Sequence, residues 1–183
     1  MLKIASLLGA AMLLCGLSGN AMAAAAATKS AEAAKPTDPQ IAHIAYTAGV
    51  LDIKAAQQAL QKSQNADVRA FAQDMVRDHT SVNDQALALC KKLGVTPEDN
   101  DTSKGLVKDA DAYRAKLAGL NGAEFDKAYA EHEVAYHHSV NGALETTLIP
   151  DASNAELKSL LQTGLKIFQG HEEHARTLAA GLK

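Results

Sequence analysis

The chain has 183 residues, of which 18 are basic, 21 are acidic and 47% are hydrophobic, giving a formal net charge of −3. Its charge is nearly balanced and no basic patch stands out, so nucleic acid is not expected as a partner. It has only two cysteines, and one of them lies in an N-terminal apolar run, which excludes a disulfide framework.

The first 23 residues are typical of a secretory signal peptide. Lys3 supplies a positive charge, residues 4–17 form an apolar run, and residues 21–23 (AMA) form a small-x-small cleavage motif. Attachment as a lipoprotein through Cys15 is disfavoured, because Leu14 stands where processing needs a small residue. We therefore expect residues 1–23 to be removed and the mature chain to be periplasmic.

The rest of the chain is expected to be helical. Residues 24–38 are alanine-rich and of low complexity, and we interpret them as a flexible N-terminal segment. Beyond them the apolar residues recur at helical spacing, no strand pattern competes, and no run is long enough to span a bilayer. Long helices are expected over residues 39–64, 66–93, 122–148 and 153–181, with a short helix over 103–118.

Residues with known preferences mark the expected helix ends. Asp38 before Pro39 is a favourable N-cap, and Ser153 with Glu156 three residues later fits a capping box. Gly94 is expected to end the second long helix as its C-terminal cap.

The spacing of these helices predicts the architecture. Short turns join the first helix to the second and, at Pro150, the third to the fourth, so each pair should be antiparallel. Residues 95–121 are long enough to cross the whole bundle. The expected fold is all-α, a ferritin-like antiparallel four-helix bundle over residues 39–183 whose long crossover carries a short extra helix between helices 2 and 3.

Each long helix places an ionisable residue on or near its apolar stripe. These residues are Asp52, His79, His137 and His171, with Glu133 one turn before His137. Asp52 and His79 are almost equally far from the turn near residue 65, so they should lie level. His137 and His171 fit worse, with an expected offset of about 10 Å along the bundle.

An aspartate, a glutamate and three histidines inside an apolar bundle suit a first-row transition metal such as Zn, Cu, Fe or Mn. Met75, one turn before His79, would add a softer donor that favours copper. A di-iron centre is disfavoured because the chain has no Glu-x-x-His motif. The alternative is that these groups only hydrogen-bond across helices, for example as an Asp52–His79 pair.

The remaining histidines and Cys90 are not expected to belong to a functional site. The other histidines after the signal peptide are expected at the surface or rim of the bundle: His43, His132, His138 and His174. Cys90 on an apolar stripe reads as a small buried hydrophobe. Since no nucleophile–base pattern or phosphate loop is present, no catalytic residue is expected, and the protein is not expected to be an enzyme.

Several segments resemble the secreted bacterial ferritin-like proteins of domain of unknown function 4142. They are residues 48–53 (AGVLDI), 71–80 (FAQDMVRDHT) and 125–129 (FDKAY), followed by His137 and His171. The resemblance implies a ferritin-like four-helix bundle exported to the periplasm, and it implies no established activity.

The resemblance also picks out the polar residues of the stripes. The family's three histidines fall on His79, His137 and His171, and its acidic residue in the first helix falls on Asp52, where members usually have Glu. Aspartate shortens the reach of that carboxylate.

We therefore expect an exported helical-bundle protein that binds a transition metal or small ligand among five core residues, with a role in envelope stress. Those residues are Asp52, His79, Glu133, His137 and His171. The alternative is a structural or protein-interaction bundle without metal. The partners considered are a second copy of the chain or another envelope protein.

Overall fold

The computed structural model describes residues 35–182, and within this range the chain is all-helical with no strand, as predicted. The expected signal peptide and residues 24–34 lie outside the described residues. No described helix combines the length and the apolar character that crossing a membrane requires. The elements are α1 (Asp38–Lys62), α2 (Ala66–Leu93), α3 (Asp101–Ala118), α4 (Gly122–Ala143), a π-helical turn (Leu144–Leu148), α5 (Ile149–Asp151) and α6 (Ala155–Gly181).

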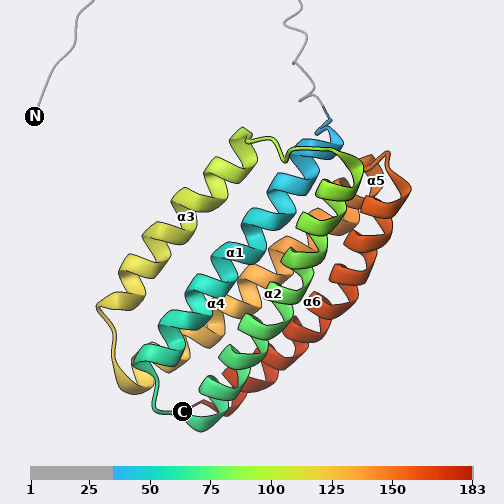
Figure 1. The fold of residues 1–183 in the computed structure, drawn as a ribbon. Coiled ribbons are helices and arrows are strands. Elements are labelled where there is room, and N and C mark those ends of the chain that lie inside the picture. The colour runs from blue at the N-terminus through green and yellow to red at the C-terminus, as the bar shows by residue number, and fades with distance from the viewer. Residues whose placement is uncertain (1–34, 183) are drawn as a thin grey trace, which may run out of the picture. The chain divides into compact units, whose positions relative to one another are not determined.

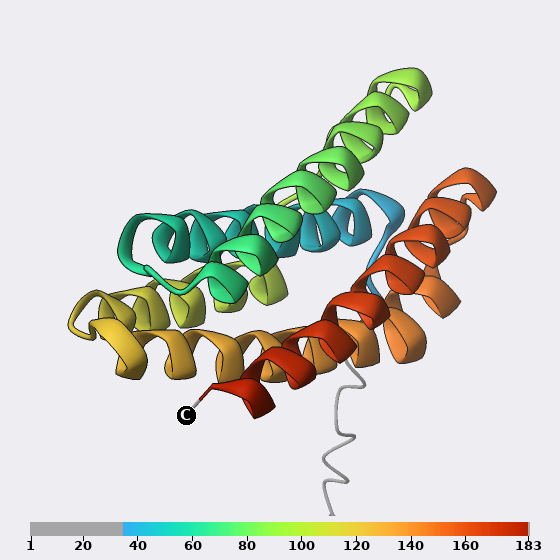
Figure 2. The ribbon, with the colours of Figure 1, turned by 90° about the horizontal axis from the view of Figure 1, so that it is seen from below.

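Four long helices surround the core. α1 and α2 pack as one antiparallel pair, α4 and α6 pack as another, and the two pairs lie on each other as two layers (Figures 1 and 2). α3 lies outside these four helices, mainly against α1, and carries the chain from the end of α2 back to the start of α4 (Figure 1). The long helices therefore all present one face to a shared interior.

That interior has a polar layer between two apolar clusters. One cluster surrounds Phe71 and Tyr129 near the turn between α1 and α2, and the other surrounds Ile41, Leu148 and Leu161 near the opposite end. Between them, at intermediate positions along every long helix, lie buried polar side chains: Asp52, His79, Asn83, Glu133, His137, Asn141 and His171. Packing on both sides leaves these side chains with little exposure to solvent.

Two helix caps differ from the sequence prediction by one residue. Thr37, not Asp38, is the N-cap of α1, and Asn154, not Ser153, caps α6 through its side-chain oxygen. The Asp38 carboxylate instead reaches across to the start of α6, where it accepts hydrogen bonds from the Ser153 hydroxyl at 2.6 Å and from the backbone N–H groups of Ser153 and Asn154 at 2.8 and 2.9 Å. Asp38 thus joins two helices that are distant in the sequence. Gly94 is the C-cap of α2, as predicted, and adopts a left-handed conformation with φ of 64°.

Pro150 does not end the helical path where the sequence predicts. The helix continues from α4 through the π turn and α5 to Asp151. Proline lacks an N–H group and its ring crowds the carbonyl four residues earlier, and the wider π turn just before it relieves this conflict. Within that turn the Thr146 hydroxyl donates to the Gly142 carbonyl at 2.7 Å. The second hairpin is consequently longer on its α4 side than predicted.

Candidate metal centre

The structure brings together all five residues that the sequence analysis selects. Asp52 in α1 lies level with His79 in α2, as predicted, with 2.6 Å between Oδ2 of Asp52 and Nε2 of His79. The same carboxylate oxygen is 3.4 Å from Nε2 of His137 in α4. Glu133, one turn earlier in α4, places Oε2 3.5 Å from Nδ1 of His137.

The three imidazoles form one cluster. Ring centroids are 5.6 Å apart for His79 and His137, and 5.3 Å apart for each of the other two pairs with His171. One nitrogen from each ring lies within 4.8 Å of those from the other two rings. The expected 10 Å offset between His137 and His171 is therefore wrong. The helix extends beyond Pro150 and α6 begins only at Ala155, so the turn lies farther from His137 than the sequence suggests.

A second set of donors shares one of these rings. Asp52, Glu133 and His137 each offer one ligand atom within 4.8 Å of the other two. All three are buried, with exposed fractions of 2%, 0% and 1%. The cluster is thus a row of donors in which His137 stands between the carboxylates and the other imidazoles.

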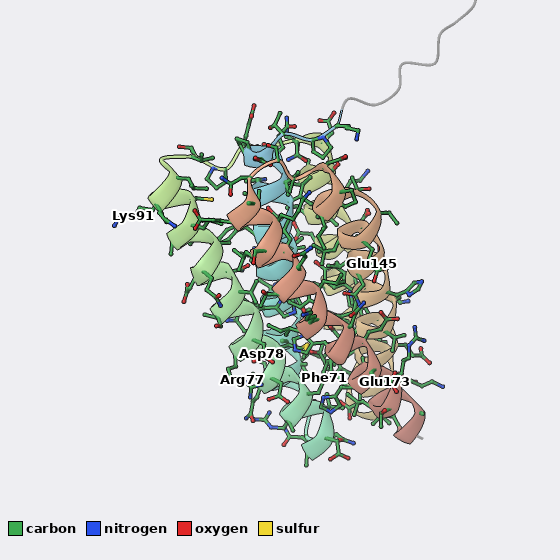
Figure 3. The ribbon with its side chains drawn as sticks, turned by 90° about the vertical axis from the view of Figure 1, so that its right-hand side faces the viewer. Phe71, Arg77, Asp78, Lys91, Glu145 and Glu173 are labelled. Carbon is green, nitrogen blue, oxygen red and sulfur yellow. The ribbon has the colours of Figure 1, made fainter. Side chains whose placement is uncertain are left out.

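Hydrogen bonds orient two of the rings. Nδ1 of His137 is 3.0 Å from the Glu133 backbone carbonyl, so it carries the proton and leaves the Nε2 lone pair free. Nε2 of His171 is 3.0 Å from Oδ2 of Asp78 in α2, which leaves Nδ1 of His171 free. Asp78 is itself bound by Arg77, and Figure 3 labels both on α2 beside α6. Carboxylates that hold a histidine in this way are typical of metal sites.

The cluster contains many buried polar atoms without a hydrogen-bond partner. They are both carboxylate oxygens of Asp52 and of Glu133, both ring nitrogens of His79, Nε2 of His137 and Nδ1 of His171. Asp52 and His79 approach to 2.6 Å, yet their atoms are not aligned for a hydrogen bond. An unsatisfied buried polar group costs about 1–3 kcal/mol. A cation bound by these atoms would remove that cost, so the donors present fit a metal ion.

Burial sets the charge of the cluster. It lowers the pKa of His137, and it lowers the pKa of His171 to about 4 even though Asp78 opposes the shift. Burial, followed by the charge of Asp52, raises the pKa of Glu133 well above its ordinary value. Burial also acts to raise the pKa of Asp52, but the adjacent His79 and His137 outweigh it and lower that pKa. At neutral pH His137 and His171 are therefore neutral, as metal ligands must be, and the two pKa shifts favour the anion at Asp52 and the protonated form at Glu133.

Two contacts of the cluster were not predicted from the sequence. Asp78 was visible as a neighbour of His79, but its role depends on α6, which helical periodicity within α2 does not report. Phe168 stacks on His79 with 4.5 Å between ring centroids and 6° between planes. A phenylalanine on an apolar stripe is expected in the core, and nothing in the sequence indicates which ring it stacks on.

The other described histidines belong to neither donor set, although His132 lines a small cavity together with Asp52 and Glu133. His138 and His174 are exposed, as expected, and His43 is half-buried. His132 is also half-buried and stacks on Tyr113, with 3.4 Å between ring centroids and 12° between planes. Its burial lowers its pKa to about 4, so it differs from a solvated histidine at the rim.

Comparison with known proteins gives one family and two similar structures. The family model described as a domain of unknown function (DUF4142) matches residues 23–178. A crystal structure of a DUF305 fragment from Deinococcus radiodurans has a TM-score of 0.67 and 14% identity, covering 80% of this chain and 99% of that one. CopM in its Cu(II)-bound form has a TM-score of 0.62 and 13% identity, covering 82% and 100%. At these identities the likeness concerns the fold alone. A comparison with curated protein sequences gives no match.

Proposed function

The chain belongs to the DUF4142 family, and we propose that it binds a transition metal ion, with Cu(II) the best candidate, in the polar layer of its core. The observation that supports this most strongly is the convergence of unpartnered nitrogen and oxygen atoms from four helices. The ligands would be His79, His137 and His171, with Asp52 as the anionic donor. Asp78 would hold the ring of His171 in place.

The donor set limits the choice of metal. Three imidazoles and a carboxylate suit Cu(II) or Zn(II), and they provide too few oxygen atoms for Mg²⁺ or Ca²⁺. Copper is favoured because CopM, which shares this fold, is known in a Cu(II)-bound form. Met75, buried one turn before His79, adds a softer donor nearby. Bound copper would supply positive charge to Asp52 and a coordination partner to each free imidazole lone pair.

The proposal includes the fold family and the place of action. The two antiparallel helix pairs, joined by a crossover that carries α3, support the proposal of a ferritin-like bundle. The signal-peptide pattern in residues 1–23 supports export to the periplasm. A metal-binding protein there would hold copper during envelope stress, and we assign it no catalytic role.

Metal analysis and thermal denaturation of the mature chain, prepared without a histidine tag, test the proposal. The protein should retain Cu(II) after dialysis and melt at a higher temperature with Cu(II) than with a chelator. At a free metal concentration of 100 Kd the stabilisation is about 2.7 kcal/mol. Nitrogen coupling in the EPR spectrum should report the imidazoles. If neither Cu(II) nor Zn, Fe or Mn is retained and none shifts the melt, the proposal is wrong.

The second candidate is a bundle whose buried polar groups only fix the register of the helices. His79→Phe and His137→Leu separate the two ideas. A metal site predicts that both variants lose Cu(II) stabilisation, measured against the stability of each variant without metal. His138→Leu, in the exposed residue next to His137, is the matched control and should keep the Cu(II) response. Equal metal responses in all these variants would favour the second candidate.

A further inference from the structure

An apolar cavity of about 110 Å³ adjoins the imidazole cluster. Its walls come mainly from small and aliphatic side chains on α1, α2, α4 and α6, among them Ala45, Ala86, Val140 and Gly164. Phe168, which stacks on His79, also lines it. The cavity thus extends from the polar layer into the apolar cluster near the start of α1.

Small residues at facing positions explain why this space is not filled. Ala45 and Ala86 are partly buried and lie two turns from Asp52 and His79 on their own helices, where a leucine would reach into the cavity. At Gly164 a Cβ atom would meet Phe168 at 3.3 Å and Val82 at 3.8 Å. Helix backbones therefore form part of the wall, and the side chains opposite do not close the gap.

The cavity meets only the nitrogen side of the cluster. Among the five core donors, His79 and His137 line it, whereas Asp52 and Glu133 line a separate cavity of about 10 Å³ beside Tyr113 of α3. A molecule in the larger cavity would therefore face imidazole rings and mainly aliphatic groups, with Asn83 and Tyr136 also in the wall, and would not touch the carboxylates. A charged molecule would be penalised there because it would lose its hydration without a partner of opposite charge.

We propose that this cavity binds a small, uncharged, mainly apolar molecule and holds its single donor atom against the metal bound by the imidazoles. The size fits a single six-membered ring at most, since an engineered apolar cavity of about 150 Å³ in another protein binds benzene. The contact with metal rests on the proposed function. Occupation of the cavity by the apolar part of the ligand does not.

Benzene and pyridine form a matched pair of probes, because they have nearly the same shape and only pyridine carries a donor atom. Benzene added to the metal-free mature chain should shift the methyl NMR signals of residues that line the cavity, such as Val82, Val140 and Leu161. Pyridine added to the Cu(II)-loaded chain should change the EPR spectrum by coordinating the metal, and benzene should not.

Cavity-filling variants decide between specific binding and partition into the core. Ala86→Leu and Ala45→Leu should abolish the benzene shifts and the pyridine effect while Cu(II) affinity is kept, and Ala88→Leu, on the exposed face of α2, should change neither. One of the two filling variants is enough for the test, provided that its circular dichroism spectrum shows the native helix content.

The two probes separate failure of this inference from failure of metal binding. No methyl shift with benzene, or equal shifts in the filled variants, overturns the cavity site whether or not copper binds. Benzene shifts without any pyridine effect on bound Cu(II) overturn the contact with the metal. If the chain binds no metal, the proposed function fails, and the benzene result still decides whether the cavity is a binding site.

Discussion

Glu133 lies beside Asp52 in a layer with almost no exposure to solvent, and the two carboxyl groups cannot both ionise there without a large desolvation cost. Burial and the charge of Asp52 raise the pKa of Glu133 far above 4.5, the value of the unfolded chain. Between pH 4.5 and the raised pKa of Glu133 in the folded state, the folded protein keeps a proton that the unfolded chain releases. Stability therefore falls as pH rises through this window.

Glu133→Gln should remove that pH dependence, because glutamine has the same shape and does not titrate. In the metal-free chain, the variant should gain stability relative to the wild type by up to about 1.4 kcal/mol per pH unit above about pH 5. Urea denaturation at a series of pH values measures this difference. Glu131→Gln, an exposed site on the same helix, is the control and should follow the wild type. Parallel curves for Glu133→Gln and the wild type would show that Glu133 is ionised in the folded state.

At the scale of elements, Asp38 connects the start of α1 to the start of α6. Its carboxylate accepts three hydrogen bonds from Ser153 and Asn154, and these donors hold its pKa below the usual value despite the opposing effect of burial. The contact fixes the relative height of two helices that carry Asp52 and His171. It also supplies acceptors to the chain just before α6, where backbone N–H groups lack helical partners.

Asp38→Ala should destabilise the protein by about 1–2 kcal/mol, the lower part of the range for lost hydrogen bonds to a charged group because the site is partly exposed. Chemical denaturation of the metal-free variant measures the loss. Asp84→Ala removes an exposed carboxylate in the middle of α2 and should change stability by less than about 0.5 kcal/mol. Equal effects at the two positions would mean that the link between α1 and α6 contributes nothing.

Helix spans follow from local signals, so the sequence predicts most of them. α2 has the predicted bounds, since Gly94 is a strong local stop. Caps are harder to predict, because Thr37 and Asp38, or Ser153 and Asn154, are adjacent residues that can both serve. Only the tertiary contact between Asp38 and α6 decides which residue is free to cap.

The candidate site was predictable only where local signals fix the position of a turn. Asp52 and His79 flank a short turn, and counting residues from it places them level. The same count fails for His137 and His171, because a π turn and a proline inside the helix shift the position of the second turn. Asp78 was missed because it acts on a ring from another helix.

At the scale of the whole molecule, stability is expected to be uneven. α3 packs mainly on α1 and buries only Ser103 and Leu117, whereas α1 buries residues along its whole length. Few buried contacts permit local opening at a low free energy. The donors of the candidate site lie on α1, α2, α4 and α6, and none lies on α3.

Hydrogen exchange followed by mass spectrometry should show this division. Amides of α3 should exchange at least roughly tenfold faster than those in the middle of α1. Cu(II) should slow exchange around the polar layer in the four long helices and leave α3 unchanged. Equal protection of α3 and α1 would contradict the uneven stability, and equal slowing of all helices by Cu(II) would contradict the assignment of the ligands.

The position of His137 between the two donor sets has a consequence for stoichiometry. Both sets include His137, and its Nδ1 donates to the Glu133 carbonyl, so the ring has a single lone pair to offer. An ion held with His79 and His171 removes that lone pair from the set with Asp52 and Glu133. The two sets are thus alternatives, and titration should saturate at one ion per chain, without the magnetic coupling of a paired copper centre.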